Sequence, residues 1–410
     1  MSFDYARRVL STQYEITVES TTDLVKSVKA AQNSRQPRTR RAVSIPPTKV
    51  PRVFNRLHGT RRLQLRPVEL LRKVGELTTP SSVNDFELSS SWATIRYFWA
   101  INLSTTLPGA NQPFCLSQDA RAIDFHQKQL LSDEFGIGMA GLVAERLMGT
   151  TAFADISAAL DDPGNYQGIF LGGERKPDYL MWDDSNSTAP YYVVECKGSQ
   201  TNRATSIGQL RSGLEQIPSV QFGRGPRNII SLVIGTFLRQ SSTRVFIVDP
   251  PNGIDPENYP KEPSKKATER IGEKEWRILD WARFDNRAWI GHELQLLRWV
   301  EQHETANSVA RSMEISTGER AYPVRNAPLE LKETPRGIYQ GLTSQFGPGF
   351  RGMSISAFRG VRDDLLTPLL EMRHEATRQA SSRMVLQPES DLPSNSSFGP
   401  NGTCLIVNIP

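Results

Sequence analysis

The feature that most constrains the fold is a hairpin signal near the middle of the 410-residue chain. Two apolar runs, Tyr179–Trp182 and Tyr191–Val194, flank a polar turn with the sequence DDSNST. Apolar runs joined by a polar turn are typical of two antiparallel strands. If the hairpin is symmetric about the Asn186–Ser187 bond, Asp178 lies opposite Glu195. Opposed residues of an antiparallel pair have Cβ atoms roughly 4.5–5.5 Å apart, so the sequence predicts a close pair of carboxylates.

Two carboxylates this close repel each other unless a cation lies between them, and a divalent metal is the natural cation. Strand alternation puts Glu195 and Lys197 on one face of the strand and Cys196 on the other. A metal polarises a phosphate and lowers the pKa of water, and an ammonium orients the nucleophile and offsets developing charge. The pattern therefore indicates metal-assisted hydrolysis of a phosphodiester.

The surrounding sequence predicts an α/β fold. Apolar residues recur at helical spacing between residues 117 and 149, which predicts two helices, the second beginning near Ser132. Further along, the patterns predict strands at 168–171, 179–182, 191–195, 229–237 and 244–248, and a helix at 206–217. Helix, three strands, helix and two strands is an order suited to one sheet flanked by helices.

Pro177-Asp178, a hairpin, and then Glu195-Cys196-Lys197 at the end of an apolar strand resemble the PD-(D/E)xK nuclease superfamily. The resemblance covers residues 117–251 and implies a restriction-endonuclease-like core, with a central mixed sheet flanked by helices. It implies that Asp178, Glu195 and the backbone carbonyl of Cys196 bind Mg²⁺, with Mn²⁺ as an alternative. It also implies that Lys197 positions the attacking water. The alternative interpretation is that these are ordinary charges at strand ends and in a turn.

Two further site residues follow from the resemblance. The family often supplies an acidic residue from the preceding helix, and Glu145 is preferred over Glu134 because it lies within the apolar helix itself. The helix after the motif lysine often supplies a polar residue, for which Gln209 is the first candidate and Gln216 the second. Each of these residues has a plainer interpretation as a solvated surface side chain.

The segment 35–66 is basic, contains no acidic residue, and has four prolines between residues 37 and 51. Such a segment indicates an exposed arm that binds nucleic acid, and the alternative is a solvated linker. The arginines expected to contact DNA are Arg38, Arg40, Arg41, Arg61 and Arg62. The net charge of +5 is small, so the distribution of charge matters more than its sum.

The chain length predicts more than one domain. We expect an N-terminal region at 1–112 and a nuclease core at 113–305, followed by a C-terminal region at 306–410 that ends in a loop-like tail. Both flanking regions are predicted to be mainly helical or irregular. The three cysteines are widely spaced, no apolar run is long enough to span a bilayer, and no signal-peptide pattern is present. These features predict a cytoplasmic protein that does not associate with a membrane.

The sequence therefore predicts a Mg²⁺-dependent deoxyribonuclease. The alternatives are a non-catalytic nucleic-acid-binding or assembly subunit on a nuclease-like scaffold, and an RNA-directed nuclease. A stand-alone endonuclease is expected to act as a homodimer, and translocation along DNA would require a separate ATPase partner, because no nucleotide-binding motif is present. By analogy, such an enzyme suits bacterial restriction or anti-phage defence.

Overall fold

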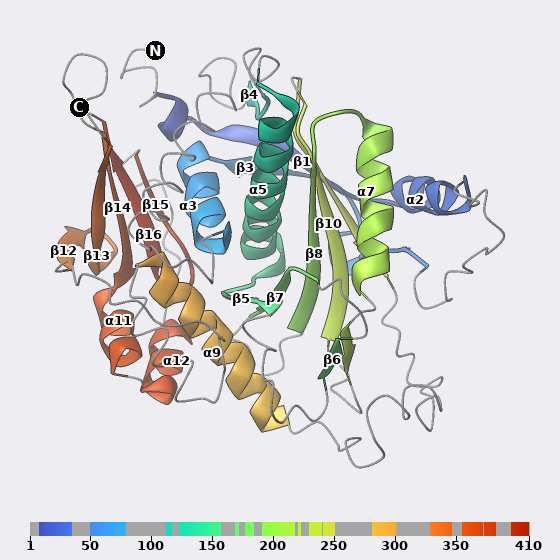
Figure 1. The fold of residues 1–410 in the computed structure, drawn as a ribbon. Coiled ribbons are helices and arrows are strands. Elements are labelled where there is room, and N and C mark those ends of the chain that lie inside the picture. The colour runs from blue at the N-terminus through green and yellow to red at the C-terminus, as the bar shows by residue number, and fades with distance from the viewer. Residues whose placement is uncertain are drawn as a thin grey trace.

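The computed structural model contains a large mixed sheet and a smaller antiparallel sheet, with helices around and between them (Figure 1). The structure describes residues 8–34, 50–78, 112–116, 123–156, 169–171, 177–183, 191–217, 220–222, 229–239, 241–250, 281–300, 329–346, 355–371, 373–382 and 395–409.

The large sheet has nine strands, and seven of them follow the order β3-β1-β11-β10-β8-β7-β5. The strands of this path are β1 (Tyr14–Ser20), β3 (Gly59–Leu65), β5 (Ala152–Asp155), β7 (Tyr179–Trp182), β8 (Tyr191–Ser199), β10 (Ile229–Phe237) and β11 (Arg244–Asp249). Strand β2 (Arg52–Val53) pairs with β11, and β4 (Gln112–Pro113) pairs with β1. Strands β5, β7 and β8 form an antiparallel meander, whereas β8 and β10 are parallel. The sheet is therefore mixed, as predicted.

Helices cover both faces of this sheet. Helices α5 (Phe125–Val143) and α3 (Pro67–Thr78) share one buried apolar cluster with the side chains of Val194 and Cys196. Helices α7 (Arg203–Gln216) and α2 (Thr22–Ser34) share the other cluster with Val193. Helix α7 is the crossover between the parallel strands β8 and β10. The predicted α/β class is therefore confirmed.

The predicted helix boundary at Ser132 is wrong. Helix α5 is continuous from Phe125, and Asp124 caps its first turn by accepting a hydrogen bond from the Gln127 N–H at 3.0 Å. Ser132 lies inside the helix, where its hydroxyl donates to the carbonyl of Lys128 at 2.6 Å. A serine can satisfy its hydroxyl in this way, so a helix continues through a sequence that resembles a cap.

Helix α5 crosses β8 at two glycines. A Cβ atom on Gly198 would lie 1.7 Å from the carbonyl oxygen of Ser132, and one on Gly136 would lie 2.9 Å from the Gly198 nitrogen. Both obstacles are backbone atoms, which cannot move aside as a side chain can. This close approach holds α5 against the strand that carries Glu195 and Lys197.

We expect Gly198→Ala to destabilise the protein by about 3 kcal/mol, at the upper end of the range for overpacking. The reason is that the methyl group would overlap the backbone of α5. Gly208→Ala in α7 is the control, because nothing lies within 4 Å of a Cβ at that position. Urea unfolding of the two variants measures the difference, and equal stabilities would contradict the close approach.

The described residues of the C-terminal region are not mainly helical or irregular, contrary to the prediction. It forms a five-stranded antiparallel sheet in the order β12-β13-β14-β16-β15. The strands are β12 (Glu330–Thr334), β13 (Gly337–Phe346), β14 (Ile355–Arg362), β15 (Ser396–Phe398) and β16 (Thr403–Asn408). The helices described in this region are α11 (Asp363–Leu370) and α12 (His374–Ser382), and α9 (Trp281–Trp299) lies before it in the chain. Glycine and proline between short apolar runs resemble irregular structure, but here they separate strands.

The N-terminal region also departs from the prediction, because β1 and β3 belong to the large sheet. Helix α3 begins at Pro67, and Arg66 alone separates it from the end of β3 at Leu65. Proline is well suited to the first position of a helix. The two remaining strands described, β6 (Ile169–Leu171) and β9 (Val220–Phe222), pair only with each other. No helix among the described residues is both long and apolar enough to cross a membrane.

Candidate active site

The predicted hairpin register is confirmed. Tyr179 pairs with Val194 and Trp182 with Tyr191, which is the pairing expected for symmetry about the Asn186–Ser187 bond. The turn itself lies outside the described residues. The Asp178 N–H donates to the carbonyl of Val194 at 3.1 Å, so Asp178 precedes β7 at the level of Glu195. The hairpin therefore brings the two predicted carboxylates together.

The site lies at an open edge of β8. Strand β7 begins at Tyr179, whereas β8 continues to Ser199. Beyond the end of the β7 pairing, the Cys196 N–H donates to Oδ2 of Asp178 at 2.7 Å. The carboxylate thus accepts the hydrogen bond that a longer β7 would have accepted through its backbone. Because the N–H and C=O of a strand residue point to the same side, the Cys196 carbonyl also faces this edge.

The two faces of β8 are occupied as predicted. Cys196 packs in the apolar cluster on the α5 side, and burial raises the pKa of its thiol well above the ordinary value. Glu195 faces α7, where a Cβ on Gly213 would lie 3.1 Å from Cγ of Glu195. Lys197 makes an ion pair with Oε1 of Glu195, and its side chain is 22% exposed. The ammonium group is therefore beside the carboxylates and within reach of solvent.

Both carboxylates have raised pKa values. Burial raises the pKa of Glu195 to about 8, the neighbouring Asp178 adds to the shift, and Lys197 opposes it. Burial raises the pKa of Asp178 to about 6, although the Cys196 N–H and Lys197 act in the opposite direction. Apart from the Lys197 ammonium, no described residue donates a hydrogen bond to the carboxylate oxygens of Glu195. A nearby positive charge would stabilise the ionised form of both groups.

These residues fit a divalent cation. No group of three or more His, Cys, Asp or Glu side chains in the described part of the chain is placed to hold a metal ion. The oxygen donors at the edge are instead Asp178, Glu195 and the Cys196 carbonyl. Mg²⁺ prefers oxygen donors, keeps several waters, and is usually bound through one or two carboxylates. Two carboxylates and one carbonyl at a partly open edge meet that requirement.

Two further aspartates lie near the site and were missed in the sequence. Asp155 ends β5 opposite Tyr179, and its charge raises the pKa of Asp178. Asp133 of α5 also raises the pKa of Asp178, and it interacts with Lys197. In the sequence, Asp133 only follows the expected helix start at Ser132, and the strand that ends at Asp155 is four residues long, too short for a clear pattern. Only the pairing of β5 with β7 places Asp155 beside the motif.

The structure does not bring Glu145 to Asp178 and Glu195. Its carboxylate binds Arg72 at 2.8 Å and also pairs with Lys73. Glu134 is half-buried on α5. About three turns of helix separate Glu134 from Glu145, so the two carboxylates cannot both reach the same site.

The polar residues predicted on the helix after Lys197 lie on the face of α7 that also carries Gly213. Gln209 is four residues before Gly213 and Gln216 three residues after it, so all three share one side of the helix. Both glutamines are half-buried. Since Gly213 contacts Glu195, this face lies over the candidate site.

The arginines expected to bind DNA are only partly described, because Arg38, Arg40 and Arg41 lie outside the described residues. Arg61 and Arg62 are exposed in β3, the outermost strand on that side of the path, and Arg62 lies 3.5 Å from Glu15. The described part of the basic segment, residues 50–66, therefore forms strands β2 and β3 with a short 3-10 helix (Asn55–Leu57) between them, and not an extended arm. Strands β1, β11 and β10 separate β3 from β8, a distance of about 19 Å at 4.8 Å per strand.

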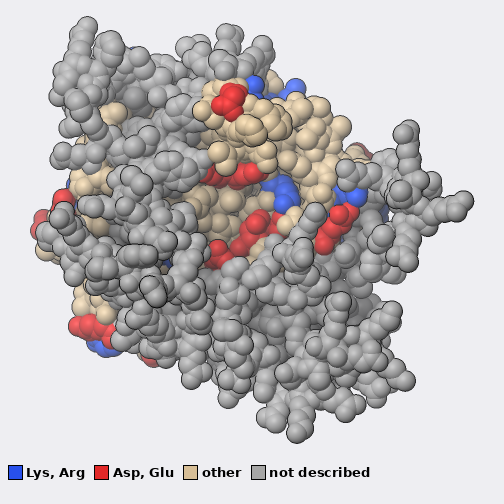
Figure 2. Space-filling view, viewed as in Figure 1, with Lys and Arg blue, Asp and Glu red and all other residues tan. Residues whose placement is uncertain are grey.

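Figure 2 shows charged side chains of both signs close together near the middle of one face, in the region of α5, β8 and α7.

Searches of protein-family models, of curated proteins and of solved structures find no match to this chain.

Proposed function

We propose that the protein is a Mg²⁺-dependent nuclease of the PD-(D/E)xK kind that hydrolyses DNA. The observation that carries the proposal is the register of β7 and β8, which places Asp178 at the level of Glu195 beside Lys197. The element order α5, β5, β7, β8, α7 and β10 supports it. An antiparallel meander followed by a helix crossover to a parallel strand is compatible with a restriction-endonuclease-like core.

In this proposal Asp178, Glu195 and the carbonyl of Cys196 hold the metal ion. When bound, Mg²⁺ supplies Lewis-acid polarisation of the phosphate and a lowered pKa of water. Lys197 orients the attacking water and offsets the charge that develops on the phosphate. The resemblance implies products with 5′-phosphate and 3′-hydroxyl ends. Asp133 adds a carboxylate from the preceding helix, the role that the sequence had suggested for Glu145.

The trio Asp178, Glu195 and Lys197 favours an enzyme over a non-catalytic scaffold. The Glu195 carboxylate is 0% exposed and close to Asp178. Burying two like charges together lowers the stability of the fold, and in a non-catalytic scaffold no reaction would compensate for that loss. An RNA-directed nuclease is the second candidate. A homodimer, a separate ATPase partner, a cytoplasmic location and a role in restriction or anti-phage defence remain parts of the proposal that rest on analogy.

Incubation of the purified protein with plasmid DNA or single-stranded RNA, each with Mg²⁺ or EDTA, tests the proposal. We expect nicked or linear DNA only with Mg²⁺. Cleavage of RNA alone would favour the second candidate. Nucleic-acid binding without any cleavage in Mg²⁺ or Mn²⁺ would favour the scaffold.

We also expect Arg61→Gln combined with Arg62→Gln to weaken DNA binding and to flatten its salt dependence. Each lost phosphate contact removes about 0.9 from the slope of log K against log salt, so the pair should remove about 1.8. The matched control replaces Lys26 and Lys29, two exposed cations on α2, by glutamine. An unchanged slope in the arginine variant would leave these charges with another role, such as protecting an outer strand from pairing with other chains.

A further inference from the structure

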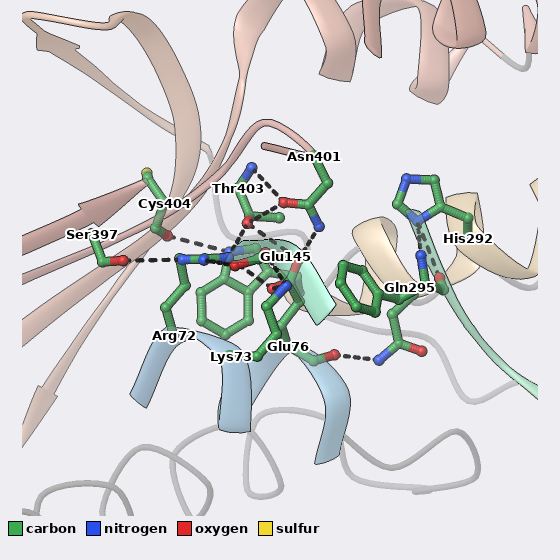
Figure 3. Close-up of polar contacts among 12 residues, drawn as sticks. Arg72, Lys73, Glu76, Glu145, His292, Gln295, Ser397, Asn401, Thr403 and Cys404 are labelled. Carbon is green, nitrogen blue, oxygen red and sulfur yellow. Dashed lines mark hydrogen bonds and ion pairs between the residues drawn. The ribbon is translucent and has the colours of Figure 1, made fainter. Parts of the chain in front are cut away.

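Four buried charges lie between the two sheets, away from the candidate active site. Arg72, Lys73 and Glu76 come from α3, and Glu145 comes from a single π-helical turn, Ala144–Met148, at the end of α5. Their side chains are at most 3% exposed. Arg72 lies 2.9 Å from Glu76 and 2.8 Å from Glu145, and Lys73 pairs with the same two carboxylates (Figure 3). These four residues are the charge cluster discussed below.

The charge cluster is electrically balanced. Burial by itself would lower the pKa of Arg72, but Glu145 and Glu76 outweigh burial and hold it above its ordinary value. Burial would raise the pKa of Glu76, but Lys73 and Arg72 hold it below its ordinary value. Arg72 and Glu76 therefore remain charged inside the protein. Because the cluster holds two cations and two anions, removal of any one member leaves an uncompensated buried charge.

A turn of the C-terminal sheet completes the charge cluster. The Thr403 hydroxyl donates to Glu76 at 3.2 Å and accepts from Arg72 at 3.1 Å, and the Asn401 amide donates to Glu76. Arg72 also donates to the hydroxyl of Ser397 at 3.1 Å. A Cβ on Gly399 would lie 2.3 Å from Nη1 of Arg72, so the turn approaches the guanidinium as closely as a glycine permits. Figure 3 shows these side chains meeting from α3, the π-helical turn and the C-terminal strands.

The charge cluster contacts β5, and helix α3, which carries three of its four members, contacts β7 next to Asp178. The Lys73 ammonium lies 3.9 Å above the ring of Phe153 in β5, and Phe153 pairs with Met181 of β7. Just after β5, the Ile156 N–H donates to the carbonyl of Asp178 at 3.1 Å. The hydroxyl of Tyr179, the residue after Asp178, donates to the carbonyl of Leu77 in α3 at 2.6 Å.

We propose that the charge cluster positions strands β5 and β7, and thereby Asp178, and that docking of the C-terminal sheet completes this positioning. Lys73 and Glu145 are then positioning residues: neither contacts the site, but both fix the elements that do. The effect on catalysis rests on the proposed nuclease function. The effect on the position and mobility of β5 and β7 does not.

A purely stabilising role does not explain the cluster. Replacing a buried ion pair by residues of similar volume and no charge is often neutral or stabilising, whereas removing one partner is strongly destabilising. The two roles can be separated by a variant that removes one cation and one anion together. The double variant Lys73→Met with Glu145→Gln does this, because Arg72 and Glu76 remain paired at 2.9 Å.

We expect the single variant Glu145→Gln to lower the Tm by roughly 5 °C or more, and the double variant to return to within about 2 °C of the wild type. In the double variant the amides of β5 and β7 should exchange with deuterium at least tenfold faster than in the wild type. Its kcat for plasmid nicking should fall about tenfold while KM is unchanged. Wild-type exchange and wild-type kcat in a double variant with restored Tm would overturn the proposal.

If the double variant does not fold, Thr403→Val provides the same test from the C-terminal side, since it removes one hydroxyl at nearly constant shape. It should accelerate exchange in β5 and β7, and unchanged exchange would overturn the proposal. Thr343→Val is the matched control, because that hydroxyl donates to Glu330 within the same sheet, away from the cluster. If the wild type does not cleave DNA or RNA, the proposed function fails, and the exchange measurements still decide whether the cluster positions these strands.

Discussion

Glu195→Gln should reduce Mg²⁺-dependent cleavage by about 10³-fold or more, since it removes a carboxylate that holds the metal and leaves the shape of the side chain unchanged. It should not destabilise the metal-free protein. The pKa of Glu195 is raised to about 8 from an ordinary value of 4.5, so the folded state binds the proton more tightly than the unfolded state does. The wild type therefore loses stability as the pH rises from about 4.5 through about 8. The side-chain amide of the introduced glutamine cannot ionise, so the variant does not lose stability over this pH range.

The stability of the two proteins measured between pH 5 and pH 9 without metal tests the second part of this prediction. The Tm of the wild type should fall relative to that of the variant as the pH rises, and Mg²⁺ at pH 8 should raise the Tm of the wild type only. Asp178→Asn should lose cleavage to the same extent. Glu215→Gln, which breaks the Arg211–Glu215 pair on the nearby helix α7, is the control and should cleave normally. Wild-type cleavage by either site variant would show that the metal is held elsewhere.

The candidate site could be predicted from the sequence where its geometry is local. The separation between Asp178 and Glu195 spans a single hairpin, so the symmetry of two apolar runs was enough to fix which residues lie opposite each other. Strand alternation then assigned Glu195 and Cys196 to opposite faces, as the structure confirms. Both inferences depend on the period of a strand and not on distant contacts.

The positions of Asp155 and Glu145 depend on contacts between residues far apart in the chain. Asp155 reaches Asp178 only because β5 pairs with β7, and β5 is too short to give a clear pattern. Glu145 was expected at the active site because it is an acidic residue in an apolar helix. The structure gives a different reason for the position of Glu145: its carboxylate binds Arg72, which is 73 residues away in the chain. No local pattern shows which distant cation will neutralise a buried carboxylate, so helix spacing could not separate the two roles.

Lys197→Met should lower the turnover of DNA by about 10²- to 10³-fold while leaving Mg²⁺ binding intact. The ammonium orients water and offsets charge on the phosphate, but it is a cation and cannot be a metal ligand. In the structure it pairs with Glu195, whose carboxylate is fully buried. Removing the lysine therefore leaves Mg²⁺ as the main source of positive charge for Glu195. Mg²⁺ should then bind more tightly at high pH.

At neutral pH the tighter binding of Mg²⁺ to the Lys197→Met variant should largely disappear. Lys197 opposes the rise in the pKa of Glu195, so its removal raises that pKa further and protons compete more strongly with the metal. Calorimetric titration of Mg²⁺ at pH 7 and pH 9, beside a plasmid-nicking assay, measures both effects. Cys196→Ser is the control: its side chain packs on the α5 side and only its backbone faces the site, so turnover should be unchanged. Loss of turnover in Cys196→Ser with normal turnover in Lys197→Met would mean that β8 presents its opposite face to the substrate.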